Sequence, residues 1–264
     1  MGEGHGYLLD NGQREAGRRF DALSALFDDS TFRHARRLGL APGWHVWEVG
    51  AGAPTVPRWL VEQVGSTGRV LVTDIDVSWM EGDAGFEVRR HDVGVDPAPE
   101  GPFDLVHARL VLVHVPRRQE ALASMVAGLR PGGWLLVEEA DPALQPLACP
   151  DEIGEEERLA NRLKHGFREL MAARGVDLAY GRTLPRRLRQ AGLIEVGATA
   201  AFPIGGAHCD ELERATAEQI RKRLVEAGLA TDGEIDRHLA NVASGRLDLA
   251  TSPMVSAFGR KPAA

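Results

Sequence analysis

The residues best suited to hold a ligand lie in the segment WEVGAGAP, at 47–54. Gly50 and Gly52 are separated by one residue, and Glu48 precedes Gly50 by two positions. Glycines without a Cβ let a loop approach a bound molecule closely, so that backbone N–H groups can point at it. An apolar run precedes the loop and a helical pattern follows it. The segment therefore predicts a cofactor loop between a strand and a helix.

Two acids follow the next apolar run, in the segment VTDID at 72–76. A carboxylate at the end of the neighbouring strand can accept hydrogen bonds from both hydroxyls of a ribose. Asp74 and Asp76 both qualify by position, although Asp76 is equally suited to a turn. Glycines at one strand end and an acid at the next form a more specific signal than the glycines alone.

Two positions in and beside the loop indicate what kind of cofactor it takes. The dinucleotide fingerprint G-x-G-x-x-G requires a glycine where this chain has Thr55. The carboxylate of Glu48 would repel a pyrophosphate, but it suits a cationic ligand with an amine or a sulfonium. The pattern thus opposes a nicotinamide oxidoreductase, which remains an alternative of low weight.

The elements around these residues alternate between strand and helix. We expect strands near 45–49, 69–73, 86–90, 103–107 and 133–138, a last strand within 252–261, and helices at about 55–64, 117–130, 154–174 and 209–245. The stretch 182–202 reads as a helix, a stop at Gly192 and a strand. Such alternation predicts a mainly parallel sheet covered by helices on both faces, with ligands beyond the carboxyl ends of the strands.

The first part of the chain reads as helix. Apolar residues recur at helical spacing over 12–27, and the polar residues 28–30 interrupt the pattern. Ser30 could cap a second, short helix at about 31–39. We expect residues 1–40 to form a helical lid over one domain at 41–264.

Five motifs in order make a resemblance clear. WEVGAGAP resembles the first motif of class I S-adenosylmethionine-dependent methyltransferases, E-x-G-x-G-x-G, and LVTDID, RRHDV, FDLVHARLVLVHVPR and LRPGGWLLVEE resemble the motifs that follow it. The match covers about residues 40–140 and is similar to the small-molecule branch, which includes ubiquinone/menaquinone and natural-product methyltransferases. Pro54 departs from the family, which prefers glycine there. Proline is tolerated in a first helical turn, so a working loop is expected.

The resemblance implies an α/β fold, Rossmann-like and doubly wound, with a mostly parallel seven-stranded sheet. Helical cap insertions are expected at about 142–180 and 203–250, where they would shape the acceptor pocket. The implied cofactor is S-adenosylmethionine, and the implied reaction is methyl transfer to an oxygen, nitrogen or carbon nucleophile of a small molecule in secondary metabolism. Apolar residues in and beside these insertions favour an apolar or aromatic acceptor.

The resemblance also assigns cofactor contacts, from the amino-acid end of the cofactor to its adenine. They are Glu48, Gly50 and Gly52 at the amino-acid end, Ala108 and Arg109 at the methionine, Asp74 at the ribose, Ile75, Asp92 and Val93 at the adenine, and Tyr7 as a closing residue. Structural alternatives stay open: a salt-bridged acid for Glu48, a loop acid for Asp92, and a carboxylate partner for Arg109.

An acceptor that must lose a proton needs a base, and histidine is the natural candidate. His107 ends the fourth expected strand, and Asp141 follows the fifth. With Tyr7 they are the candidate catalytic residues. His5, His114, His165 and Glu139 are weaker candidates, and packing alone accounts for His114. No His/Asp spacing supports a metal site, so none is expected.

Composition narrows the function classes further. A net charge of −7 opposes a nucleic-acid binder, and no DNA-methyltransferase tetrad or Pro-Cys motif is present. Two cysteines far apart in the sequence fit a reducing cytoplasm. No apolar signal core or membrane span is expected, and a homo-oligomer stays open. A non-methylating member of the same fold, cyclase-like or scaffolding, is the main alternative function.

Overall fold

The computed structural model describes residues 8–9, 14–80 and 85–263, and the chain divides into two compact units. The sheet unit comprises Asp28–Ala140, Tyr180–Ala201 and Met254–Ala264. The helical unit comprises Met1–Phe27, Asp141–Ala179 and Phe202–Pro253. The strands are β1 His45–Val49, β2 Arg69–Asp74, β3 Glu87–Arg90, β4 Phe103–Arg109, β5 Leu129–Ala140, β6 Ile194–Ala201 and β7 Met254–Arg260. The helices are α1 Arg14–Arg37, α2 Thr55–Val64, α3 Arg118–Gly128, α4 Glu155–Ala172, α5 Tyr180–Gln190, α6 Ala207–Glu226 and α7 Asp232–Ala243.

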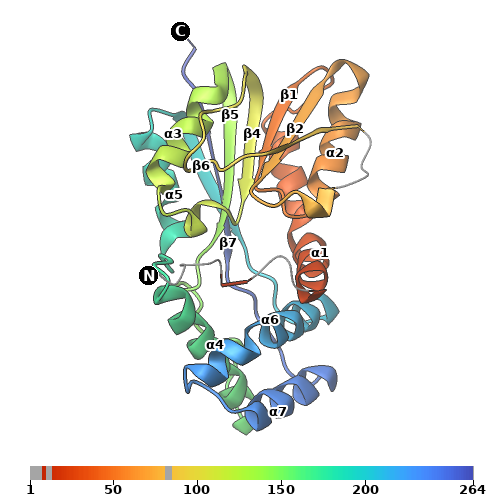
Figure 1. Ribbon diagram of the computed structural model, residues 1–264, viewed down its shortest axis with the longest axis vertical. Helices are drawn as coiled ribbons and strands as arrows, with labels where there is room; N and C mark the ends of the chain where they lie inside the picture. Colours follow the sequence, from red (N-terminus) through yellow and green to blue (C-terminus); the bar gives the residue numbers. More distant parts are fainter. Residues whose placement is uncertain (1–7, 10–13, 81–84, 264) are drawn as a thin grey trace. The chain divides into compact units, whose positions relative to one another are not determined.

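In the described part of the chain, seven strands form one sheet in the order β3-β2-β1-β4-β5-β7-β6 (Figure 1). The first five strands pair in parallel, and β7 runs antiparallel to both β5 and β6. The order reverses at β1 and β4, so the carboxyl ends of these strands flank the point where such sheets bind ligands. The expected mostly parallel, seven-stranded sheet is confirmed.

Helices cover both faces of the sheet because its central strands are apolar on both sides. Figure 1 shows α2 on one side of the sheet and α3 and α5 on the other. Val46 of β1 and Leu105 of β4 are fully buried in a cluster that also takes Leu60 of α2 and Ala35 of α1. The sheet is therefore a rigid support for the loops at its carboxyl edge.

The first helix differs from the expectation. The chain forms one continuous helix, Arg14–Arg37, where an interruption at 28–30 and a new start at Ser30 were predicted. The Asp28 carboxylate pairs with Arg109 at 2.8 Å, and the Ser30 carbonyl is 2.7 Å from Nδ1 of His34, one turn on. Asp28 is thus held by a partner on β4 within one unbroken helix, and the prediction of two helices was wrong.

The helical unit has a core of its own. Leu159 and Leu163 of α4 pack with Ile220 and Leu224 of α6 and with Ile235 of α7. These positions recur at helical spacing on each element, which is why the sequence pattern located the helices. Among the described residues, no helix has both the length and the apolarity that crossing a membrane requires.

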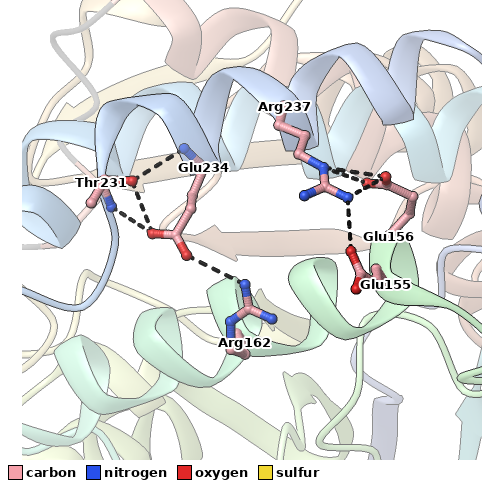
Figure 2. Close-up of polar contacts among 6 residues, drawn as sticks. All are labelled: Glu155, Glu156, Arg162, Thr231, Glu234 and Arg237. Carbon is pink, nitrogen blue, oxygen red and sulfur yellow. Dashed lines mark hydrogen bonds and ion pairs between the residues drawn. The ribbon is translucent and has the colours of Figure 1, made fainter.

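Polar contacts join α4 to α7 on the surface of the helical unit (Figure 2). Arg162 donates to Glu234 at 3.3 Å, and Arg237 lies 2.6 Å from Glu156. Exposed pairs of this kind each contribute little to stability. The buried leucine and isoleucine contacts beneath them therefore hold the two helices together.

The start of α7 makes a testable contribution to stability. Thr231 accepts a hydrogen bond from the Glu234 N–H, and Glu234 accepts one from the Thr231 N–H, which is a complete capping box (Figure 2). Thr231→Ala should lower the free energy of unfolding by about 1 kcal/mol, measured by urea denaturation. Thr216→Ala, in the middle of α6, is the matched control and should change it little. Equal effects of the two substitutions would contradict this role of the cap.

Candidate functional site

The loop after β1 has the geometry of a ligand cradle. Gly50 and Gly52 have φ of +63° and +60°, a region that favours glycine. A Cβ at Gly50 would lie 2.4 Å from Cγ2 of Val111, so no larger residue fits without displacing that side chain. The loop ends at Pro54, which immediately precedes α2 and whose carbonyl accepts the Arg58 N–H at 2.9 Å. Proline at this helix start sacrifices no helical hydrogen bond.

Asp74 at the end of β2 joins that strand to the loop. One carboxylate oxygen accepts the Gly52 N–H and the other accepts the Asp76 N–H, each at 3.0 Å. The side chain is buried, and burial raises its pKa against the opposing effect of these N–H groups. Asp76 instead accepts the N–H of Ser78, and hydrogen bonds from Ser78 lower its pKa. Asp76 therefore lies in a turn, and Asp74 faces the loop.

The residues predicted at the adenine follow β2 and β3. Ile75 is 60% exposed, which is unusual for an isoleucine next to a buried strand end. Asp92 is exposed, and its carboxylate accepts the Gly94 N–H at 2.9 Å. Val93 is buried beside it. An exposed apolar side chain and an exposed carboxylate thus lie on adjacent loops at the carboxyl edge of the sheet.

The end of β4 brings two more predicted residues to that edge. Ala108 is fully buried and pairs in register with Val49, the last residue of β1. Arg109 lies 2.8 Å from the Asp28 carboxylate and donates to the Thr31 hydroxyl at 3.2 Å. Its guanidinium is therefore held by α1, which agrees with the carboxylate-partner interpretation of this residue.

Glu48 and His107 form part of a buried polar ladder across the sheet. His107 Nδ1 is 2.6 Å from the Glu48 carboxylate, and Nε2 is 3.1 Å from the Glu138 carboxylate. Glu138 also accepts hydrogen bonds from the hydroxyls of Ser256 and Thr31. The ladder crosses β1, β4, β5 and β7 and reaches α1, and all five side chains are buried.

The ladder fixes the charge of His107 and of Glu138. Burial alone would lower the pKa of His107, but Glu48 and Glu138 outweigh it and raise the pKa to about 9. Burial opposes the charge of Glu138 too, yet His107 and Arg109 hold its pKa at about 2. His107 is thus a buried cation between two carboxylates. Because both ring nitrogens are engaged, this geometry does not favour the predicted role of His107 as a general base.

The other proton-transfer candidates are dispersed. Asp141 belongs to the helical unit, is fully buried, and accepts the Leu144 N–H at 3.1 Å. His165 is exposed and lies 3.0 Å from Glu169, one turn further along α4. His114 is half-buried at the end of a short 3-10 helix. Tyr7 and His5 lie outside the described residues. Among the residues described, no group of three or more His, Cys, Asp or Glu side chains is arranged so that it could hold a metal ion.

Sequence reasoning missed Glu138, Ser256 and Thr31. A signal existed for Glu138, since an acid in the apolar strand LLVEE must be paired when buried. Its partner could not be deduced, because strand register joins residues far apart in the chain. Nothing in the sequence indicated that α1 would supply Thr31.

The helical unit contains a cavity of about 540 Å³. Its lining combines apolar and charged residues, namely Leu147, Glu152, Arg158, Asn161, Arg162, His165, Gly166 and Leu229. Arg162 is partly neutralised by its contact with Glu234 (Figure 2).

Comparison with known proteins identifies the family. A family model described as a methyltransferase domain matches residues 11–195, which is more than half of the chain. The chain belongs to the class I S-adenosylmethionine-dependent methyltransferases. The family and the fold expected from the motifs are both confirmed.

Curated proteins of similar sequence include quinone-biosynthesis methyltransferases. The chain is 33% identical over 143 residues to the ubiquinone/menaquinone biosynthesis C-methyltransferase UbiE of Laribacter hongkongensis, a match that covers 49% of this chain and 59% of the relative. The matched region thus spans about three-fifths of that curated relative.

Solved structures share the fold at low sequence identity. Phosphoethanolamine N-methyltransferase 2 of Haemonchus contortus superimposes with a TM-score of 0.60 at 16% identity, over 99% of this chain and 61% of that one. The [4+2]-cyclase SpnF superimposes with a TM-score of 0.50 at 16% identity, over 90% of this chain and 81% of that one. A cyclase therefore has the same fold as this chain.

The residues at the carboxyl edge suit the family's cofactor. The loop is held at both glycines: the Gly50 N–H donates to the Thr73 carbonyl at 2.6 Å, the Gly52 N–H donates to Asp74, and Val111 packs where a Cβ of Gly50 would lie. Asp74 is a buried carboxylate on the next strand, and Ile75 presents an exposed apolar surface beside it. A carboxylate and an apolar surface are the groups that a ribose and a base would require.

The buried cation His107 predicts a pH dependence. Its pKa is 6.5 when exposed and about 9 in the folded chain, so its stabilising effect is complete below pH 6.5 and is lost as pH rises through 9. The free energy of unfolding should fall by on the order of 3 kcal/mol over this interval. His107→Gln keeps hydrogen-bonding capacity but cannot titrate, and it should lack this component. Other groups titrate alike in wild type and in His107→Gln. If the two profiles of unfolding free energy against pH, measured by urea denaturation, are parallel, the assignment of this pH dependence to His107 is refuted.

Proposed function

We propose that this protein transfers the methyl group of S-adenosylmethionine to a small-molecule acceptor. The observation that carries the proposal is the tie between the glycine loop and Asp74, in a chain of this family. The Gly52 N–H is held by the Asp74 carboxylate, so the loop and the ribose-binding acid form one unit at the strand ends.

Each predicted contact has a role in this proposal. The loop at Gly50 and Gly52 binds the amino-acid end of the cofactor, and Asp74 binds the ribose hydroxyls. Ile75 packs on the adenine, while Asp92 and Val93 border its amino group. One oxygen of Glu48 already contacts the His107 ring. In the proposal Glu48 therefore contributes to the cofactor site as part of the charged pair that it forms with His107.

The remaining contacts complete the methionine end. Ala108, with a side chain too small to obstruct the site, borders it in the proposal. The guanidinium of Arg109 is bound to Asp28 and Thr31. In the proposal Arg109 therefore acts through its backbone, at the end of β4. Tyr7 keeps its predicted closing role as a proposal.

The chemistry places few demands on acid–base groups. The cofactor supplies a methyl group already activated on a sulfonium. The protein aligns that carbon with the nucleophile and excludes water, and alignment alone can contribute about 7–11 kcal/mol. Because His107 has no unengaged ring nitrogen, we assign it to positioning Glu48, and Asp141 and Tyr7 remain the proposed proton-transfer residues.

The acceptor in this proposal is an apolar or aromatic molecule of secondary metabolism. The similarity to UbiE supports an apolar or aromatic acceptor, since that relative acts in ubiquinone/menaquinone biosynthesis. The insertions expected at about 142–180 and 203–250 supply acceptor recognition in the proposal. It also places the enzyme in the cytoplasm, in keeping with two free, buried cysteines. A homo-oligomeric state remains part of the hypothesis.

A second candidate function is a cofactor-binding protein that does not transfer methyl groups. The structural similarity to SpnF favours keeping it, because a cyclase is built on this fold. Incubation with methyl-labelled S-adenosylmethionine and a panel of phenols, quinols and amines separates the two. Label in any acceptor supports the first function, and cofactor binding without transfer across the panel supports the second.

Cofactor binding is tested with two acids that lie two residues apart. The wild-type protein should bind S-adenosylhomocysteine in the micromolar range by calorimetry. Asp74→Asn should weaken binding about ten- to hundredfold, the effect of losing charged hydrogen bonds to the ribose. Asp76→Asn is the matched control, because that acid is engaged in a turn with Ser78, and it should bind within about threefold of wild type. Absence of wild-type binding would overturn the proposed function.

A further inference from the structure

A second acid of β5, Glu139, is fully buried and bonded to backbone far from it in sequence. Its Oε1 accepts the N–H groups of Val111, Leu112 and Val113 at 3.1, 2.6 and 3.4 Å. These amides open the 3-10 helix Leu112–His114 that follows β4. The first N–H groups of a helix have no partner within it, so Glu139 satisfies donors that would otherwise be buried and unpaired.

The turn that Glu139 holds is conformationally demanding. Leu110 has φ of +58°, a left-handed conformation that costs a non-glycine residue free energy. Its N–H donates to the Glu138 carbonyl at 2.8 Å. Hydrogen bonds from β5 thus constrain the turn on both sides of Leu110, and the surroundings compensate for its strain.

The same turn meets the cofactor loop. Val111 supplies the methyl group that lies 2.4 Å from the position of a Cβ at Gly50. The side chain of Val111 therefore packs directly against the first loop glycine. Its backbone N–H is one of the three that Glu139 binds. A chain of contacts runs from Glu139 through Val111 to Gly50, with all members in the sheet unit.

We propose that Glu139 is a positioning residue for the cofactor: it fixes the turn after β4 so that Val111 holds the loop at Gly50 in its binding conformation. The inference rests on the proposed function, because it concerns the same cofactor site. Glu139 acts through Val111 and contacts no ligand in this scheme.

The remaining oxygen of Glu139 defines the substitutions to use. Within the described part of the chain Oε2 has no hydrogen-bond partner, and burial outweighs the three N–H groups and raises the pKa of Glu139 to about 8. The side chain is therefore largely neutral at pH 7, where glutamine has the same shape and keeps the acceptor oxygen. Methionine has a similar length but offers no oxygen acceptor.

The experiment measures S-adenosylhomocysteine affinity by calorimetry at pH 7. Glu139→Met should weaken it about tenfold or more, while Glu139→Gln should restore it to within about threefold of wild type. Asp104→Ala is the control: Asp104 binds the His45 N–H and Arg130 at the amino ends of β1 and β4. It should lower stability but leave the affinity unchanged.

A double-mutant cycle tests the route through Val111. Val111→Ala should weaken binding in the wild-type background and have little further effect in Glu139→Met, because the contact with Gly50 is already displaced there. Additive effects would overturn the route. If Glu139→Met does not fold, Glu139→Asp is used instead. Its side chain is shorter by one methylene, which moves the acceptor oxygen away from the turn, and binding must then weaken.

The outcomes separate the two hypotheses. If wild type does not bind S-adenosylhomocysteine, the proposed function and the role of Glu139 fail together. If wild type binds, and folded Glu139→Met or Glu139→Asp binds equally well, only the role of Glu139 is overturned. A loss of affinity in Asp104→Ala that matches its loss of stability would also overturn it, since the effect would then be one of folding alone.

Discussion

The site depends on one buried ion cluster, in which His107 lies between Glu48 and Glu138. An unpaired charge at this depth would cost several kcal/mol, so each member requires the others. The cluster links the end of β1 to β4 and β5. Through hydroxyls of Ser256 and Thr31 it also reaches β7 and α1. The strand that carries the cofactor loop is therefore locked in register with its neighbours by charge as well as by backbone hydrogen bonds.

The contacts that hold the cofactor loop itself come from residues beside β1 that do not belong to the ion cluster. Asp74 holds Gly52 from the β2 side, whereas Val111 packs on Gly50 from the β4 side. The loop lies between the two strands that flank β1, and β2 also accepts the Gly50 N–H at the Thr73 carbonyl, at 2.6 Å. A short glycine loop has little structure of its own, so these contacts supply the preorganisation that cofactor binding would otherwise have to provide.

The sequence predicted what depends on local pattern. Apolar runs located the strands, and the spacing from Glu48 to Gly52 located the loop. It did not predict what depends on register. The pairing of Glu48 with His107, and the contact of Glu138 with Ser256, follow from strands adjacent in space but distant in sequence. The break predicted at Asp28 failed for the same reason, because Arg109 binds that carboxylate.

Glu138 and Glu139 show how one strand serves both faces of the sheet. Successive side chains of a strand point to opposite faces, so two adjacent acids cannot share one environment. Glu138 faces α1 and is ionised within the cluster, with a pKa of about 2. Glu139 faces the turn after β4, and its pKa is raised to about 8. These two adjacent acids thus fix the register of the strands on one face and the turn after β4 on the other.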